Sequence, residues 1–172
     1  MELRDVILQR RSIRQYKNET VPYEKLQEIA KYALLAPSGR NQKPVDIVIV
    51  TDKHVIEKIK KSREGAFSFL STAPACFVIV ADESSSTWIS DASIVASYVQ
   101  LLAVDYGLSS CWGHAHERYY NNLSVEAEIK NILHVPSNYR VLCVIGIGYA
   151  DEEKPYHSLQ EVDNRKMHTN QW

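Results

Sequence analysis

The sequence predicts an α+β fold, or a mixed α/β sandwich, in a single domain that spans residues 1–172. Three observations lead to this prediction. Short runs rich in β-branched residues alternate with segments of helical periodicity, so helices are mixed with three to five strands. A chain of 172 residues is long enough for one domain with a substantial core but too short for two domains. We find no internal repeat and no low-complexity linker that would divide it.

The elements follow from local pattern. Pro22 suits the first turn of a helix, and Ser124 begins another. The run from Ala75 to Ala81 is apolar on both faces, which is typical of a buried strand. We expect helices over residues 2–11, 22–36, 91–107 and 124–133, one or two short helices within 53–70, and strands over 45–50, 75–81, 107–112 and 141–148.

The longest predicted helix has Asp91 as its N-cap and ends near Gly107. Apolar side chains cover almost every face of it: Ile94, Val95, Tyr98, Val99, Leu101, Leu102 and Val104. A helix that is apolar all round is buried, either centrally or against a partner chain. The polar tail 151–172 ends in Trp172, and we expect this tail to pack on another surface, such as a second subunit.

Composition and charge exclude several classes of protein. Apolar residues make up 45% and charged residues 24% of the chain, and the formal net charge is -1. A nucleic-acid-binding protein normally carries a strong basic excess. No apolar run reaches the roughly 18 residues of a membrane span, and the charged start Met1–Asp5 lacks a signal-peptide core. We therefore expect a cytoplasmic protein with no nucleic-acid or membrane partner.

The three cysteines, Cys76, Cys111 and Cys143, lie far apart in apolar strand-like runs, which favours buried free thiols. A metal site could be drawn over Cys111–His116. A structural zinc needs a fourth ligand at the usual spacing, and none is present nearby. We expect no metal.

A cationic cluster follows the first helix. Arg10, Arg11, Ser12 and Arg14 place three guanidinium groups and one hydroxyl within five positions. Arginine carries a fork of donors that matches phosphate or carboxylate oxygens. The alternative is a solvated basic helix end, stabilised by the helix dipole. In a chain of nearly neutral charge, the cluster suits one small anionic ligand.

A polar loop, Pro37–Pro44, separates the second helix from the first strand. Glycine and asparagine tolerate unusual dihedral angles, and the two prolines stiffen the ends of the loop. The loop is either a plain connector or, because it gathers amide, hydroxyl and cationic groups, a site for a polar heterocycle.

These stretches occur in an order that resembles the FMN-dependent nitroreductase family, in one of its shorter forms. The matching stretches are Arg10–Arg14, Ala36–Asn41 with Pro44, Gly107–Trp112, Pro136, and Gly146–Tyr149. The resemblance covers nearly the whole chain, and its strength lies in the ordered set rather than in any one motif. It implies a mainly antiparallel central sheet flanked by helices, and a homodimer that holds FMN in clefts at the subunit interface.

The resemblance also implies roles for particular residues. Arg10, Arg11, Ser12 and Arg14 would bind the phosphate and ribityl chain, and Arg165 would return to the phosphate. Pro37, Ser38 and Asn41 would lie along the isoalloxazine, with Gly113 beside its other edge. Lys43 stands where the family has glutamine, and Val45 where it has tryptophan. A cation at Lys43 would stabilise negative charge on the reduced ring.

The implied activity is electron transfer from NADH or NADPH, through FMN, to nitro compounds, quinones or similar acceptors by a ping-pong mechanism. No paired-carboxylate, Ser–His–Asp or Cys–His arrangement is evident, which agrees with chemistry carried by the cofactor. We therefore expect no catalytic side chain; His114 and His116 are either near the substrate or surface and packing residues. The alternatives are other chemistry on the same fold, such as reductive dehalogenation or flavin fragmentation, and a flavin-binding storage or sensing protein.

Overall fold

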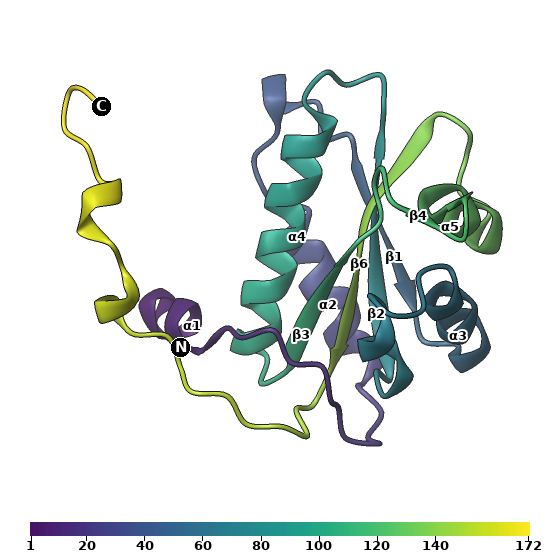
Figure 1. The fold of residues 1–172 in the computed structure, drawn as a ribbon, viewed down its shortest axis with the longest axis horizontal. Coiled ribbons are helices and arrows are strands. Elements are labelled where there is room, and N and C mark those ends of the chain that lie inside the picture. The colour runs from purple at the N-terminus through teal and green to yellow at the C-terminus, as the bar shows by residue number, and fades with distance from the viewer.

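The computed structural model describes residues 1–172 and is built around a four-stranded sheet (Figure 1). The strands stand in the order β1-β2-β6-β3, and each neighbouring pair is antiparallel. They span Val45–Val50 (β1), Ala75–Asp82 (β2), Ser109–His114 (β3) and Tyr139–Gly148 (β6). The predicted α+β class is confirmed, and so is the antiparallel sheet that the resemblance implied.

Helices cover both faces of this sheet (Figure 1). One face carries α2 (Tyr23–Ala33) and α4 (Trp88–Asp105), with α1 (Leu3–Gln9) beside α4, and the other carries α3 (Lys53–Lys61) and α5 (Val125–Leu133). The remaining elements are the hairpin β4 (Tyr119–Tyr120) and β5 (Leu123–Ser124) and the 3-10 turns η1 (Gly39–Asn41), η2 (Ser68–Ser71), η3 (Leu159–Glu161) and η4 (Asn164–Lys166). Side-chain oxygens cap two of the helices, because Asp52 accepts from the His54 amide of α3 and Ser124 from the Ala127 amide of α5.

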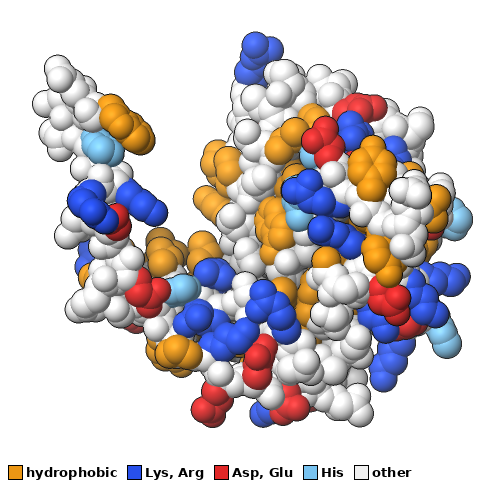
Figure 2. All heavy atoms as spheres, in the orientation of Figure 1, with side chains coloured by type: hydrophobic (Ala, Val, Ile, Leu, Met, Phe, Trp, Pro, Cys, Tyr) orange, Lys and Arg blue, Asp and Glu red, His pale blue; other side chains and the backbone are white.

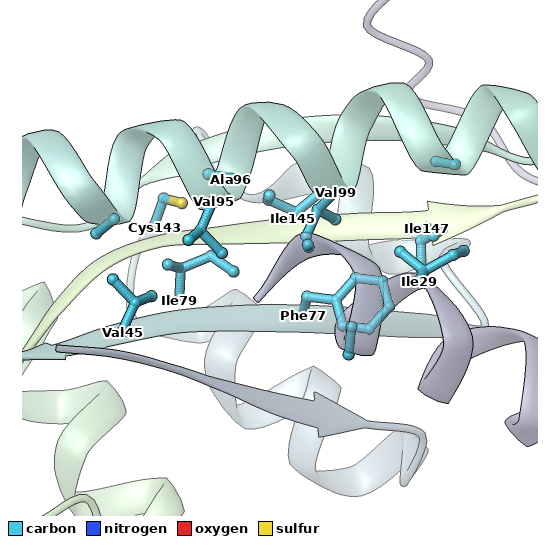
Figure 3. Packing of buried hydrophobic residues seen from close by; sticks show 14 of the residues in the cluster. Ile29, Val45, Phe77, Ile79, Val95, Ala96, Val99, Cys143, Ile145 and Ile147 are labelled. Carbon is cyan, nitrogen blue, oxygen red and sulfur yellow. The ribbon is translucent and has the colours of Figure 1, made fainter. Parts of the chain in front are cut away.

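The sheet separates two hydrophobic cores. On the α4 side, Val95 and Val99 of the helix lie over Phe77 and Ile79 of β2 and Ile145 of β6 (Figure 3). The other core is built on aromatic and aliphatic side chains from η2, α3, α5 and the opposite sheet face, namely Phe67, Phe69, Ile59, Ile129 and Val78. Because β2 and β6 are buried on both faces, they form the rigid centre on which the outer strand β3 is held.

The long helix α4 departs from its predicted start and environment. It begins at Trp88 rather than after Asp91, and the Asp91 side chain bonds to the Gly39 amide instead of capping its own helix. Its apolar residues are not all buried in this chain, since Val95 and Val99 face the core while Ile94 and Tyr98 are exposed. One side of α4 is therefore left without a covering element.

The tail leaves the body after β6 and turns back along α4 without touching most of it (Figure 1). Figure 2 shows open space between the tail and the body. Trp172 is fully exposed, with a relative accessibility of 101%. The end of the tail therefore packs on no surface of this chain, and its packing against a second subunit stays a prediction. None of the helices combines the length and apolar composition that a membrane span requires.

Candidate functional site

The Arg–Ser segment, residues 10–14, lies beside the start of β3. The Ile13 amide donates to the Ser110 carbonyl at 3.0 Å, and Ser12 forms a parallel bridge with Ser110. Ile13 is buried and anchors the segment, whereas Arg14 is exposed. The sheet edge thus fixes the backbone of the segment and leaves cationic side chains at the surface.

The beginning of the tail adds a cation to this segment. Lys154 donates from Nζ to the Ser12 carbonyl at 2.5 Å and pairs with Glu152 at 3.4 Å. Arg11 donates to the Pro155 carbonyl, and Arg10 Nη2 lies 3.3 Å from His157 Nε2. Sequence analysis missed Lys154, because a lysine in a charged run next to two glutamates looks like an ordinary solvated residue.

An acidic side chain lies within the same cluster. The Glu152 carboxylate accepts from the backbone amides of Arg14 and Gln15. The bond from the Arg14 amide is the main reason that the pKa of Glu152 lies below its ordinary value. The amides of Arg14 and Gln15 are therefore occupied and do not face an anion.

A cavity of about 590 Å³ opens between the Arg–Ser segment, the end of α4 and the beginning of the tail. Arg11 and Lys154 line it together with Val104 of α4 and Ser109 of β3. Glu152 and Glu153 also line it, so the cavity combines charged groups of both signs with apolar walls. Its cations can bind an anionic group, and its apolar wall can bind a less polar body attached to that group.

The outer edge of β3 carries an unsatisfied group. Ser110 is 1% exposed, and its Oγ has no hydrogen-bond partner. Buried hydroxyls without a partner are rare in folded proteins and call for an explanation. Beyond the bridge to Ser12 no strand covers this edge, and from Ser109 to His114 it runs for about 17 Å. That length is comparable with an extended FMN molecule, so a flavin laid along the edge would place a polar atom within reach of Ser110.

Gly113 lies near the end of this strand, where the resemblance puts the flavin ring. A Cβ added there would lie 2.7 Å from Phe67 and 2.9 Å from Phe69. The core beneath the sheet therefore requires glycine at this position. A contact between Gly113 and a cofactor remains a prediction.

The two histidines that follow Gly113 have different environments. His116 is 7% exposed, lies 3.3 Å from the Glu126 carboxylate and packs edge-on against Trp88. His114 is partly exposed and stacks with Trp112 at a centroid distance of 6.2 Å. Partial burial, with Arg118 as a further cause, lowers the pKa of His114. His116 is thus a packing residue, whereas His114 stands at the open end of β3.

The polar loop lies at the other end of α4. Ser38 Oγ accepts from the Lys43 amide at 2.9 Å, and the Gly39 amide donates to Asp91 at 3.0 Å. Asn41 and Lys43 have exposed side chains and left-handed backbones, with φ of 55° and 48°. Pro37 is exposed at the start of the loop. The loop is thus held firmly while its polar side chains remain available.

The structure separates the two halves of the predicted flavin site. The loop is held at Thr87, whereas the Arg–Ser segment shares a cavity with Val104. The seventeen residue-to-residue steps of α4 from Thr87 to Val104 correspond to about 26 Å. The two halves therefore lie near opposite ends of α4 within one chain.

Arg165 is not brought to the Arg–Ser segment within this chain. It lies in η4 on the tail, its side chain is 90% exposed, and its guanidinium pairs with Asp163 at 2.9 Å. That pair raises the pKa of Arg165 and lowers the pKa of Asp163. The predicted return of Arg165 to the phosphate therefore needs a neighbouring subunit. No group of three or more His, Cys, Asp or Glu side chains is placed to hold a metal ion.

The chain thus combines an antiparallel sheet, covered by helices on both faces, with a candidate anion site beside its outer strand. The model of the nitroreductase family matches residues 7–149. The chain therefore belongs to the nitroreductase family, and the family prediction made from its motifs is confirmed.

Three relatives illustrate this membership. A protein of Archaeoglobus fulgidus, provisionally named NADH dehydrogenase/NAD(P)H nitroreductase, is 30% identical over 97% of each chain. The structure of an FMN-dependent nitroreductase from Clostridium difficile R20291 is 43% identical and superimposes with a TM-score of 0.93, covering 97% of this chain and 98% of the other. An iodotyrosine deiodinase of Thermotoga neapolitana is 24% identical, with 93% of this chain and 95% of the relative covered.

Proposed function

We propose that this protein is an FMN-dependent oxidoreductase that takes electrons from NADH or NADPH and reduces nitro compounds, quinones or similar acceptors. The observation that carries the proposal is the Arg–Ser segment beside the uncovered edge of β3, where the unpartnered Ser110 hydroxyl is buried. The similarity to an FMN-dependent nitroreductase at 43% identity supports the choice of cofactor.

In this proposal the cationic end of the site holds the phosphate. Arg10, Arg11, Ser12 and Arg14 supply donors from the segment, and Lys154 joins them from the tail. Guanidinium groups bind phosphate oxygens in pairs, and the ammonium group adds a compact charge. Ser110 donates to a ribityl or ring atom, with Gly113 further along the strand. FMN, when bound, supplies a ring that accepts hydride and passes electrons on.

We infer that two copies of the chain form each flavin site. The loop and the Arg–Ser segment are about 26 Å apart along α4, so a partner's loop has to supply Pro37, Ser38, Asn41 and Lys43. The exposed apolar residues of α4 and of the tail support a homodimer, because a stable monomer rarely exposes such a surface (Figure 2). In the dimer, the tail of one subunit would bring Arg165 toward the phosphate.

The nicotinamide and the acceptor take turns in one cleft, which predicts ping-pong kinetics. No side chain is expected to act as an indispensable acid, base or nucleophile. The cysteines are buried and free, and burial raises the pKa of Cys76 to about 12. Unreactive reduced thiols are in keeping with the cytoplasmic location that we propose.

The test is a titration of the apoprotein with FMN and with riboflavin, followed by flavin fluorescence. Charge-assisted hydrogen bonds to the phosphate should make FMN bind at least about 100-fold more tightly. Equal affinities would contradict the phosphate assignment.

Two further measurements test the dimer and the activity. Light scattering should report twice the chain mass, and stopped-flow mixing with NADH or NADPH should bleach the bound flavin. A protein that binds FMN but is not reduced by either donor would be a storage or sensing protein.

A second candidate function is reductive dehalogenation, which the similarity to an iodotyrosine deiodinase favours. Mixing the reduced protein with a halogenated tyrosine and with a nitroaromatic compound separates the two functions. Reoxidation with halide release would favour dehalogenation, whereas reoxidation by the nitroaromatic alone would favour the nitroreductase.

A further inference from the structure

We propose that Asp91 is a positioning residue, which holds loop 38–43 from within α4 in the conformation that contacts the flavin ring. The inference rests on the proposed function, because it assumes that the loop meets a flavin. It concerns a residue in the first turn of α4 that belongs to neither half of the predicted binding site.

The Asp91 carboxylate is buried and fully engaged. It is 3% exposed, accepts the Gly39 amide at Oδ1 (3.0 Å) and accepts the Thr87 hydroxyl at Oδ2 (2.8 Å). A buried carboxylate is stable only when its oxygens are hydrogen-bonded, and its place in the first turn of α4 adds the favourable helix dipole. The bond from Gly39 is therefore a fixed feature of the fold rather than a chance surface contact.

The loop approaches α4 so closely that only glycine fits at position 39. A Cβ added to Gly39 would lie 2.3 Å from Thr87 Oγ1. A second tie lies further along the loop, where the buried Ser85 hydroxyl donates to Gln42 Oε1 at 3.1 Å. Two partly buried hydrogen bonds thus attach the loop to the first turn of α4 and to the turn that precedes this helix.

Around these two hydrogen bonds the backbone is in an unfavourable conformation. Arg40, Asn41 and Lys43 have φ of 53°, 55° and 48°. Left-handed conformations at residues other than glycine persist only where the surroundings enforce them, and they gather at ligand-binding segments. The bonds to Asp91 and Ser85 enforce this conformation, so the loop is formed before a ligand arrives. Preorganisation of this kind raises affinity because binding no longer has to order the loop.

The test compares FMN and riboflavin affinities of the full-length protein with those of Asp91→Ala and Asp91→Asn. Asp91→Ala should weaken both flavins by about tenfold, since it removes a buried acceptor that orders the loop. The FMN-to-riboflavin ratio should stay unchanged, because the loop meets the ring and not the phosphate. Asp91→Asn retains an acceptor for the Gly39 amide and should restore most of the affinity. Visible circular dichroism of the bound flavin should change in Asp91→Ala at matched loading.

The matched control is Asp105→Asn, at the opposite end of the same helix, where the carboxylate pairs with the N-terminal amine. This variant should keep both affinities. A second route does not depend on how well Asp91→Ala folds: Gly39→Ala should weaken both flavins, and Thr87→Ala in the same chain should recover part of the loss by removing the colliding hydroxyl.

Three results would overturn the inference alone while leaving FMN binding intact. They are unchanged affinities in both Asp91→Ala and Gly39→Ala, a changed FMN-to-riboflavin ratio, and dissociation of the Asp91→Ala dimer as the cause of weaker binding. An unsubstituted protein that binds neither flavin would overturn the proposed function and this inference together.

Discussion

Two charged clusters in this molecule contain the same kinds of side chain but differ in how those side chains are satisfied. The buried cluster joins Glu126, Arg140 and His116 beneath Trp88. Glu126 is 6% exposed and accepts from Arg140 Nε (2.6 Å), Arg140 Nη2 (2.9 Å) and the Val141 amide (3.0 Å). The Arg–Ser segment is open, and the Arg14 side chain makes only a long 3.5 Å bond to the Ser12 carbonyl.

The difference teaches how a structural cluster can be told from a binding cluster. In the buried cluster every charge has partners from the chain itself, so nothing remains for a ligand. In the open cluster the guanidinium of Arg14 has donors without a hydrogen-bond partner, and so does the hydroxyl of Ser110 beside the segment. We therefore expect substitutions in the first to change stability and substitutions in the second to change flavin binding.

The largest expected effect is on stability, from Arg140→Met. This change removes the arginine that pairs with the buried Glu126 carboxylate and leaves only the Val141 amide and His116 beside it, and we expect it to lower the free energy of unfolding by about 3 kcal/mol. Urea unfolding of the apoprotein measures it. The FMN-to-riboflavin ratio should stay constant, and a large shift in that ratio would show that the buried cluster also serves the cofactor.

Arg14→Ala should have the opposite effects, weakening FMN binding while leaving stability unchanged. We expect FMN to bind about 30-fold more weakly, because one charge-assisted contact to the phosphate is lost, with riboflavin affinity and the urea midpoint unchanged. Arg4→Ala is the matched control, since Arg4 is an exposed arginine of α1 outside the segment. If Arg4→Ala weakened FMN equally, general electrostatic attraction would explain the result instead of a specific contact.

Ser110→Ala tests the contribution of a single hydroxyl group beside the Arg–Ser segment. The Ser110 hydroxyl has no partner within the chain, so its removal should leave the stability of the apoprotein unchanged or slightly higher. If the hydroxyl donates to the flavin, FMN and riboflavin should each bind about fivefold more weakly. Unchanged affinity for both would exclude a flavin contact at Ser110.

The smallest effect concerns pH. Burial alone would raise the pKa of Glu126, but the hydrogen bonds from Arg140 and Val141 outweigh it and lower this pKa below its ordinary value. A lowered pKa means that the pair stabilises the protein at pH values above the unfolded-state pKa. This stabilisation is lost as the pH falls through the folded-state pKa. Urea midpoints from pH 7 to pH 3 should therefore fall less steeply for Arg140→Met than for the unsubstituted protein.

Much of the fold follows from local sequence. The strands at 45–50 and 75–81 and the helix at 124–133 were predicted within a few residues of β1, β2 and α5, because their periodicity and caps are local properties. The ordered motifs, from Arg10 to Gly148, were enough to identify the family.

Contacts between distant segments lay beyond local reasoning. Asp91 looks like an N-cap in the sequence, yet its carboxylate bonds to a loop 52 residues away. Lys154 looks like a solvated lysine until the tail places it beside Ser12, 142 residues earlier. Gly113 suggests a ligand contact, but the packing of Phe67 and Phe69 already accounts for its glycine.

The sequence by itself determined the fold class, the family and the residue types available to bind an anion, because periodicity, charge and ordered motifs are properties of neighbouring residues. Only the tertiary structure decided which of those residues meet. It showed that α4 separates the loop from the Arg–Ser segment by about 26 Å, and that Arg165 lies on a tail that leaves the body. The physical reason is that the direction and length of a packed helix, which no local pattern encodes, set the distance between its two ends.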